Sequence, residues 1–256
     1  MSKLQKNIKN ELNREGKIKK RNLIEKKQRI GRAEKQIKIL LIILMVLSAA
    51  TYFVLKIIYE TGEFTITLDE NLYKKSGLVM YEKASNKEEK KILSTDKITY
   101  LDNISVNWLP ENINEGIDGG AHNGENYIAY TFYLENQGNQ PINYWYTTII
   151  DDVIKNVDEA IRVMICMNNE KTIYAKPNSK TGENEENTKA FYSEKYAETE
   201  QRTNMQPGEI DKITLVIWIE GDDPDCLDNL IGGEIKMHME ITEEHIEDNR
   251  GGNKNE

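Results

Sequence analysis

Residues 127–150 read YIAYTFYLENQGNQPINYWYTTII, and this stretch decides the fold class. In its first part, large apolar side chains recur at every second position from Ile128 to Leu134. A period of two is typical of a half-buried antiparallel strand. The centre, Asn136–Pro141, supplies turn chemistry, because glycine and asparagine accept left-handed backbone and proline closes the turn. We therefore expect a hairpin that joins Tyr127–Glu135 to Ile142–Ile150.

The same alternation recurs elsewhere in the chain, which makes the protein mainly β. The further alternating runs are Phe64 to Leu68, Ile213 to Ile219 and Ile235 to Ile241. Only Asp152–Ala160 is typical of a helix, as a short crossover. Seven to nine short strands with turn signals between them predict an antiparallel β-sandwich of two sheets, which we place at residues 60–245.

Two long stretches inside this domain do not fit strands. Residues 112–126 contain four glycines and predict a flexible loop, and residues 177–208 predict a long polar loop rich in Glu, Asn, Lys and Thr. Loops of this length are functional or disordered. The aromatic residues Phe191, Tyr192 and Tyr196 leave two interpretations of the second loop: it docks on a partner, or they pin it locally. The polar tail, residues 246–256, is predicted to be disordered.

A membrane segment precedes the β domain. Ile39–Leu55 is a run of 17 residues without a charge, and 14 Lys and Arg against 4 Glu precede it in residues 1–38. A helix over residues 37–59 would cover roughly 34 Å, enough to cross a hydrocarbon core of about 30 Å. We predict a transmembrane signal-anchor helix at residues 39–59. The small residues Ser48-Ala49-Ala50 leave an alternative, cleavage by a signal peptidase and release of the domain.

The charge distribution predicts the orientation and the partners of this anchor. Excess Lys and Arg marks the cytoplasmic side, which places residues 1–38 inside and the β domain outside the cell. Membrane lipid would contact Ile39–Tyr59, and the basic segment would attract anionic headgroups at about 1 kcal/mol per well-placed charge. No DNA- or RNA-binding motif accompanies the basic residues, so nucleic acid is not an expected partner. The chain after residue 38 is acidic, with 20 Lys and Arg against 39 Asp and Glu.

An acidic turn is the best candidate for a metal site. Five carboxylates crowd into residues 220–228, and Ca²⁺, which takes 6 to 8 oxygen ligands, would relieve their repulsion. The predicted ligands are Glu220, Asp222, Asp223, Asp225 and Asp228. The spacing is not that of an EF-hand loop. A solvated turn at a strand end is the other interpretation, since Gly221 and Pro224 are ordinary turn residues.

Two cysteines and three histidines complete the candidates for chemistry. Cys166 and Cys226 could form a disulfide, which would contribute on the order of 4 kcal/mol in the chain-entropy model; two buried thiols are the alternative. The histidines, His122, His238 and His245, do not form an HExxH motif, and no GxSxG sequence is present. We therefore predict no catalytic residues and no cofactor apart from the Ca²⁺ considered above.

Two segments carry a resemblance to a known family. PGEIDKITLVIWIEGDDPDCLDNLIGGEIKMHMEI, at Pro207–Ile241, and LENQGNQPINY, at Leu134–Tyr144, resemble camelysin and the TasA-type biofilm matrix fibre subunits of Gram-positive bacteria. The resemblance implies an extracellular jelly-roll-like sandwich, a membrane or matrix location and assembly by strand exchange between subunits. The family has also been classed among metallopeptidases. Typical members carry a cleavable signal with a short basic region, and the long basic arm here departs from that pattern.

Two functions follow as expectations. The first is a membrane-anchored, non-catalytic cell-surface β-sandwich that acts in protein–protein interaction or in matrix or envelope assembly. It would self-associate, or bind other surface proteins, through exposed strand edges or the long loop. The alternative is a secreted metallopeptidase-like domain or an accessory enzyme domain of envelope assembly.

Overall fold

The computed structural model describes residues 35–52, 64–95 and 100–243 of the 256-residue chain. The chain divides into two compact units, Met1–Thr61 and Gly62–Glu256. Three predicted features lie outside the described residues: the basic segment up to residue 34, the end of the predicted membrane span after Tyr52, and the tail 246–256.

The first unit contains an apolar helix, Lys35–Tyr52, whose 18 residues are long and apolar enough to cross a membrane by length and composition. At 1.5 Å per residue the helix covers about 27 Å. The hydroxyls of its two small polar residues are paired within the helix. Ser48 donates to the carbonyl of Met45 and Thr51 to that of Leu47, each at 2.9 Å. Internal satisfaction of polar groups is what a hydrocarbon environment requires.

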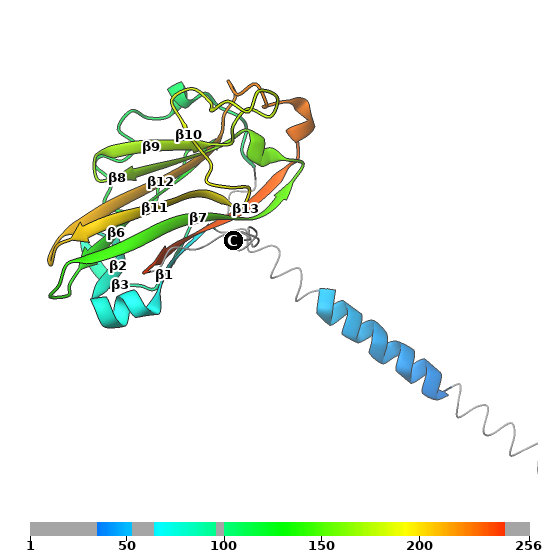
Figure 1. Cartoon of the computed structure of the whole chain (residues 1–256). Helices are drawn as coiled ribbons and strands as arrows, with labels where there is room; N and C mark the ends of the chain where they lie inside the picture. The colour runs from blue at the N-terminus through cyan, green and yellow to red at the C-terminus, as the bar shows by residue number, and fades with distance from the viewer. Residues whose placement is uncertain (1–34, 53–63, 96–99, 244–256) are drawn as a thin grey trace, which may run out of the picture. The chain divides into compact units, whose positions relative to one another are not determined.

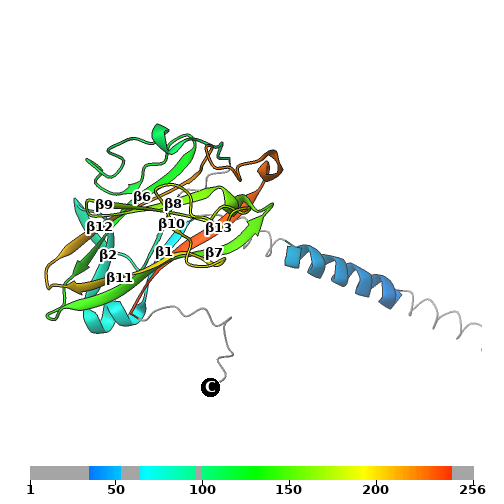
Figure 2. The ribbon, with the colours of Figure 1, turned by 45° about the horizontal axis from the view of Figure 1, so that its top comes forward.

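The second unit consists of two β-sheets packed as layers (Figures 1 and 2), which confirms the predicted fold class. The five-stranded sheet, sheet A, contains in spatial order β11 (Tyr196–Met205), β7 (Ile142–Ile154), β13 (Glu234–Thr242), β1 (Thr65–Leu68) and β4 (Ile92–Ser94). The eight-stranded sheet, sheet B, contains β10 (Lys189–Ala190), β9 (Glu170–Ala175), β8 (Ile161–Met167), β12 (Ile210–Ile219), β6 (Tyr127–Asn136), β2 (Leu78–Lys83) and β3 (Asn86–Glu89), with β5 (Gly120–Ala121) paired to β6. The short helical turns are η1 (Leu72–Ser76), η2 (Val106–Trp108), η3 (Val157–Glu159) and η4 (Asp228–Leu230).

Neighbouring strands are antiparallel with two exceptions, the parallel pairs β1–β13 and β9–β10. The four runs of alternating residues in the sequence form β1, β6, β12 and β13, as predicted. Their apolar side chains meet between the sheets, where Ile66 and Met239 of sheet A share one core with Phe132 and Leu215 of sheet B. Period-two alternation thus correctly assigned these four strands.

The outer face of sheet B is also buried, so the expectation of half-buried strands is wrong for β6 and β12. Ile104 and Ile113 lie in a second apolar cluster with side chains from that face, among them Met164, Val216 and Trp218. Thr131 of β6 and Thr214 of β12 lie opposite each other, and their buried hydroxyls, 2.7 Å apart, satisfy each other.

The glycine-rich stretch 112–126, predicted to be a flexible loop, is packed on sheet B. It contributes β5, and the phenol of Tyr133 donates to the carbonyl of Ile117 at 3.3 Å. Gly119 explains one of its glycines: φ is +135°, and a Cβ there would lie 1.8 Å from the carbonyl oxygen of Glu82. Only glycine fits a backbone approach this close.

The predicted hairpin between β6 and β7 is wrong, because the two strands belong to different sheets. β6 pairs with β12 on one side and with β2 and β5 on the other, and β7 pairs with β11 and β13. Both hydrogen-bonding edges of each strand are therefore used. The intervening turn crosses between the layers, and Asn136 fixes it by donating to the carbonyls of Gln140 and Met205, both at 2.9 Å.

Two further predictions need correction. The expected helix Asp152–Ala160 is wrong, since β7 continues to Ile154 and the chain then turns through Lys155 and Asn156, both at positive φ, into η3. The prediction of a long loop at residues 177–208 is wrong for the second half of this stretch, which contains β10 and β11. Phe191 belongs to this domain's main core cluster and Tyr196 is also buried, which favours the local-pin interpretation for these two aromatic residues.

Substitution of Gly119 by alanine should destabilise the domain strongly. The new Cβ would clash with the backbone of Glu82 and also strain the positive φ, at a cost of about 2–4 kcal/mol in the free energy of unfolding. Gly116→Ala is the matched control: its φ is also positive, at 64°, but no atom lies within 4 Å of the added Cβ. Chemical denaturation of both variants measures the difference, and equal losses would contradict the close approach.

Candidate functional site

The acidic turn follows β12 and packs beside the segment that leads into η2. Ile104 and Glu220 form a parallel bridge, which brings the two segments together. The carboxylate of Glu220, which is 6% exposed, accepts hydrogen bonds from the indole of Trp218 and from the backbone N–H of Val106, both at 3.0 Å. Asp222 accepts from the hydroxyl of Ser105 at 2.6 Å. These two carboxylates therefore fasten the turn to its neighbours.

The next two carboxylates of the turn face β8 and the polar stretch before β10. Asp223 forms a buried ion pair with the guanidinium of Arg162, from β8. Asp225 accepts from the hydroxyl and the backbone N–H of Ser179, at 2.6 and 2.7 Å. The hydrogen bonds from Ser179 lower the pKa of the Asp225 carboxyl, because they stabilise its charged form.

Asp223 and Asp225 meet a third carboxylate, Glu185, and their oxygens lie within 4.8 Å of one another. This arrangement could hold a cation, but the positive charge present there is Arg162, whose guanidinium is also 3.9 Å from Glu185. Of the five predicted Ca²⁺ ligands, the structure brings together Asp223 and Asp225. Glu220 and Asp222 make the contacts described above, and Asp228 is exposed at the start of η4. Binding of Ca²⁺ stays a prediction.

Sequence reasoning missed Glu185 and Arg162. Glu185 belongs to the stretch assigned to a loop, where it is one of many acidic residues. Arg162 carried a usable signal, because it is a charge inside the apolar strand β8, and a buried charge requires a partner.

The two cysteines are free thiols in the structure, so the predicted disulfide is not formed. Cys166 lies in the apolar cluster on the outer face of sheet B, and burial raises the pKa of its thiol to about 11. Cys226 is half-buried and accepts a hydrogen bond from the side chain of Asn103 at 3.3 Å. Arg162 is the residue of β8 that pairs with Asp223 of the acidic turn, the turn that also carries Cys226. Cys166 lies four residues further along β8, which corresponds to roughly 13 Å along a strand.

The two described histidines lie in separate places. The ring of His122, next to β5, is held between the carbonyls of Gly120 and Ile113, at 3.1 and 3.2 Å. His238, in β13 of sheet A, contacts the carboxylates of Asp151 and Glu240, at 2.8 and 3.3 Å. His245 lies outside the described residues. Each ring nitrogen of the two described histidines thus lies within hydrogen-bond distance of a local oxygen, and the tautomer decides which nitrogen donates.

An open groove of about 520 Å³ lies on the outer face of sheet B. Its apolar lining comes from Leu109, Ile113, Met164 and Ile173, and Lys171 and Lys189 are among its polar residues. Both lysine amines are occupied, by the carbonyl of Glu111 and by the carboxylate of Glu200. Nearby in the sequence, Trp108 of η2 is 75% exposed. This face therefore offers a shallow surface of mixed chemistry.

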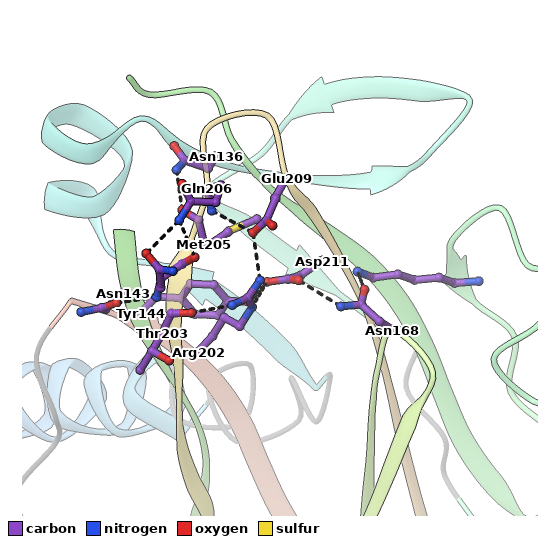
Figure 3. A network of polar contacts seen from close by, with 12 residues as sticks. Asn136, Asn143, Tyr144, Asn168, Arg202, Thr203, Met205, Gln206, Glu209 and Asp211 are labelled. Carbon is purple, nitrogen blue, oxygen red and sulfur yellow. Dashed lines mark hydrogen bonds and ion pairs between the residues drawn. The ribbon is translucent and has the colours of Figure 1, made fainter. Parts of the chain in front are cut away.

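A polar network closes the sandwich at the edge strand β11 (Figure 3). The buried carboxylate of Asp211, at the start of β12, accepts hydrogen bonds from the phenol of Tyr144 at 2.7 Å and from Arg202 at 3.1 Å. Its other oxygen accepts from Asn168 at 3.0 Å. Arg202 also contacts Glu209 at 3.0 Å. The network joins β7 and β11 of sheet A to β12 of sheet B.

Replacement of Arg162 by methionine should cost about 3–5 kcal/mol of unfolding free energy, because it leaves the Asp223 carboxylate buried without its partner. The double variant Arg162→Met/Asp223→Asn should recover part of this loss. Lys74→Met removes an exposed ion pair with Glu70 and serves as the control, with no measurable change expected. Denaturation midpoints test the series; a loss in Arg162→Met no larger than in the control would contradict the assignment.

No family model and no curated protein matches the chain. Two solved structures of a beta-glucosidase from Kluyveromyces marxianus, one in complex with glucose and one labelled with selenomethionine, are similar to it at 12% and 10% identity. The alignments cover 63% of this chain but only 15% and 16% of the enzyme, with TM-scores of 0.23 and 0.22. Similarity this low supports no conclusion about fold or activity.

Proposed function

We propose that this protein is a membrane-anchored cell-surface β-sandwich that acts without catalysis, in protein–protein interaction or in matrix or envelope assembly. The observation that carries the proposal is an apolar helix able to cross a membrane, Lys35–Tyr52, followed by a separate compact β unit. The excess of Lys and Arg before the helix supports a cytoplasmic N-terminus and an extracellular sandwich.

Strand edges are the surface we propose for self-association or for binding other surface proteins. β4 ends sheet A on the side opposite β11, and its Ile92 is 63% exposed. An edge strand with an exposed apolar side chain is a template for pairing with another chain. β11, at the other end of the sheet, turns charged side chains inward, a feature that discourages such pairing. The family resemblance, with its strand exchange between subunits, points in the same direction.

The non-catalytic reading is favoured over a metallopeptidase-like or accessory enzyme domain by the chemistry of the described residues. A catalytic zinc needs three protein ligands and an open position. His122 contacts a backbone carbonyl and His238 contacts a carboxylate, at two separate places in the domain. The carboxylates around Asp223 already pair with the guanidinium of Arg162. Neither arrangement favours the enzyme alternative.

The topology of the chain in cells tests the anchor. With tags at both termini, protease treatment of intact cells should digest the C-terminal domain and leave the N-terminal tag protected. Mass spectrometry should find the uncleaved N-terminus in the membrane fraction. A mature species that begins near Thr51 and is released to the medium would contradict the anchor and favour a secreted matrix subunit.

Pairing through β4 is tested by Ile92→Lys. The added charge should lower the fraction of cross-linked oligomer on cells, because an edge lysine discourages strand pairing. Ile231→Lys is the matched control, since Ile231 is 72% exposed and follows η4 rather than lying in an edge strand. Equal oligomer fractions in both variants and the unmodified protein would exclude β4 as the contact.

A further inference from the structure

A buried carboxyl group lies on the core-facing side of the edge strand β11. Glu198 is 1% exposed, and its Oε2 has no hydrogen-bond partner in the described chain. Its other oxygen, Oε1, accepts a hydrogen bond from the hydroxyl of Thr148, the residue opposite it in β7. A buried acceptor left unsatisfied is rare in native proteins and calls for an explanation.

The surroundings of Glu198 contain negative and neutral groups rather than a compensating cation. Glu200 lies two residues along β11, opposite Tyr146 of β7, and accepts a hydrogen bond from Tyr174 of β9 in the other sheet. The charge of Glu198 acts on both phenols and raises their pKa. The nearby amine, Lys189, pairs with Glu200 at 3.0 Å. Among the described residues no ion pair joins Glu198 to a lysine or arginine, so an ionised Glu198 would be an uncompensated buried charge.

Burial raises the pKa of the Glu198 carboxyl to about 8. The hydrogen bond from Thr148 lowers this pKa, and the charge of Glu200 raises it by a smaller amount. The carboxyl is therefore neutral near pH 7 while β11 stays docked. When the strand opens and water reaches the group, the pKa returns toward its ordinary value of 4.5, and the proton leaves.

The position of Glu198 makes this titration a local event. Among the named strands of sheet A, β11 pairs with β7 alone, and its register shifts between Tyr196 and Glu198, directly before the buried carboxyl. On its other side the backbone N–H of Tyr192 donates to the carbonyl of Ala197 at 3.3 Å. An edge strand beside a bulge opens at lower cost than a central strand. Opening of β11 exposes the hydrogen-bonding edge of β7.

We propose that Glu198 is a proton-controlled latch for β11: the neutral acid holds the strand on β7, and loss of its proton releases the strand. The open state binds the proton less tightly than the docked state. Docking is therefore weakened as the pH rises from about 4.5 to about 8, and the effect is constant above that range. This property does not depend on what the domain binds.

Hydrogen exchange of the full chain in lipid nanodiscs tests the latch. After correction for intrinsic exchange, the opening constant of β11 amides should rise about tenfold per pH unit, or roughly 50- to 100-fold from pH 5.5 to 7.5. Glu198→Gln, which is neutral at every pH, should abolish the slope. Glu200→Gln should retain it, because that carboxyl is partly exposed and paired with Lys189. Amides of β12 report any global change.

Two results would overturn the proposal: a flat pH profile for β11 in the unmodified protein, or an unchanged slope in Glu198→Gln. A direct titration keeps the test open even if that variant fails to fold. In the unmodified chain labelled with ¹³C-glutamate, one carboxyl should titrate near pH 8. Titration of every glutamate below pH 6 would overturn the latch.

Discussion

The sandwich depends on closing its edge at β11 with polar rather than apolar side chains. Asp211 is the second residue of β12 in sheet B, yet Tyr144 and Arg202 of sheet A donate hydrogen bonds to its carboxylate. Burial raises the pKa of Tyr144, with a further contribution from the charge of Asp211, so the phenol remains a donor. A charge this well partnered fixes how the two sheets align, since a shift of β11 by one residue would direct Arg202 away from it.

The same polar closure explains where the sequence was informative and where it was not. Strands β1, β6, β12 and β13 were predictable because their apolar side chains alternate toward one core. In β11, Glu198, Glu200 and Arg202 face inward, while Thr199 and Gln201 face the other way. Polar residues on both faces remove the alternation, and the strand is then indistinguishable from a loop. Pairing partners were less predictable still, because turn chemistry at Asn136–Pro141 permits a reversal without deciding which sheet the next strand joins.

The candidate site shows a similar division. The acidic turn was visible in the sequence as a cluster of carboxylates, but the partner of each carboxylate depends on tertiary contacts. Four of the carboxylates accept hydrogen bonds from other side chains. Three of the donors, Ser105, Arg162 and Ser179, come from segments far apart in the chain, and the fourth, Trp218, comes from β12 itself. The turn thereby acts first as a fastening between β8, the η2 segment and the stretch before β10. A Ca²⁺ ion in the cluster of Asp223, Asp225 and Glu185 would have to share it with a guanidinium.

The parallel pair β1–β13 has a mechanical consequence. Among the described residues of the domain, β1 is the first strand and β13 the last, and their register runs from Thr65 opposite His238 to Leu68 opposite Ile241. In a parallel pair, the start of one strand and the end of the other lie at opposite ends of the ladder. Tension between residue 64 and residue 242 would therefore act along the strands, as shear, so the ladder bonds would share the force instead of opening one at a time. Resistance to pulling would then be a property of an unfolding rate rather than of equilibrium stability.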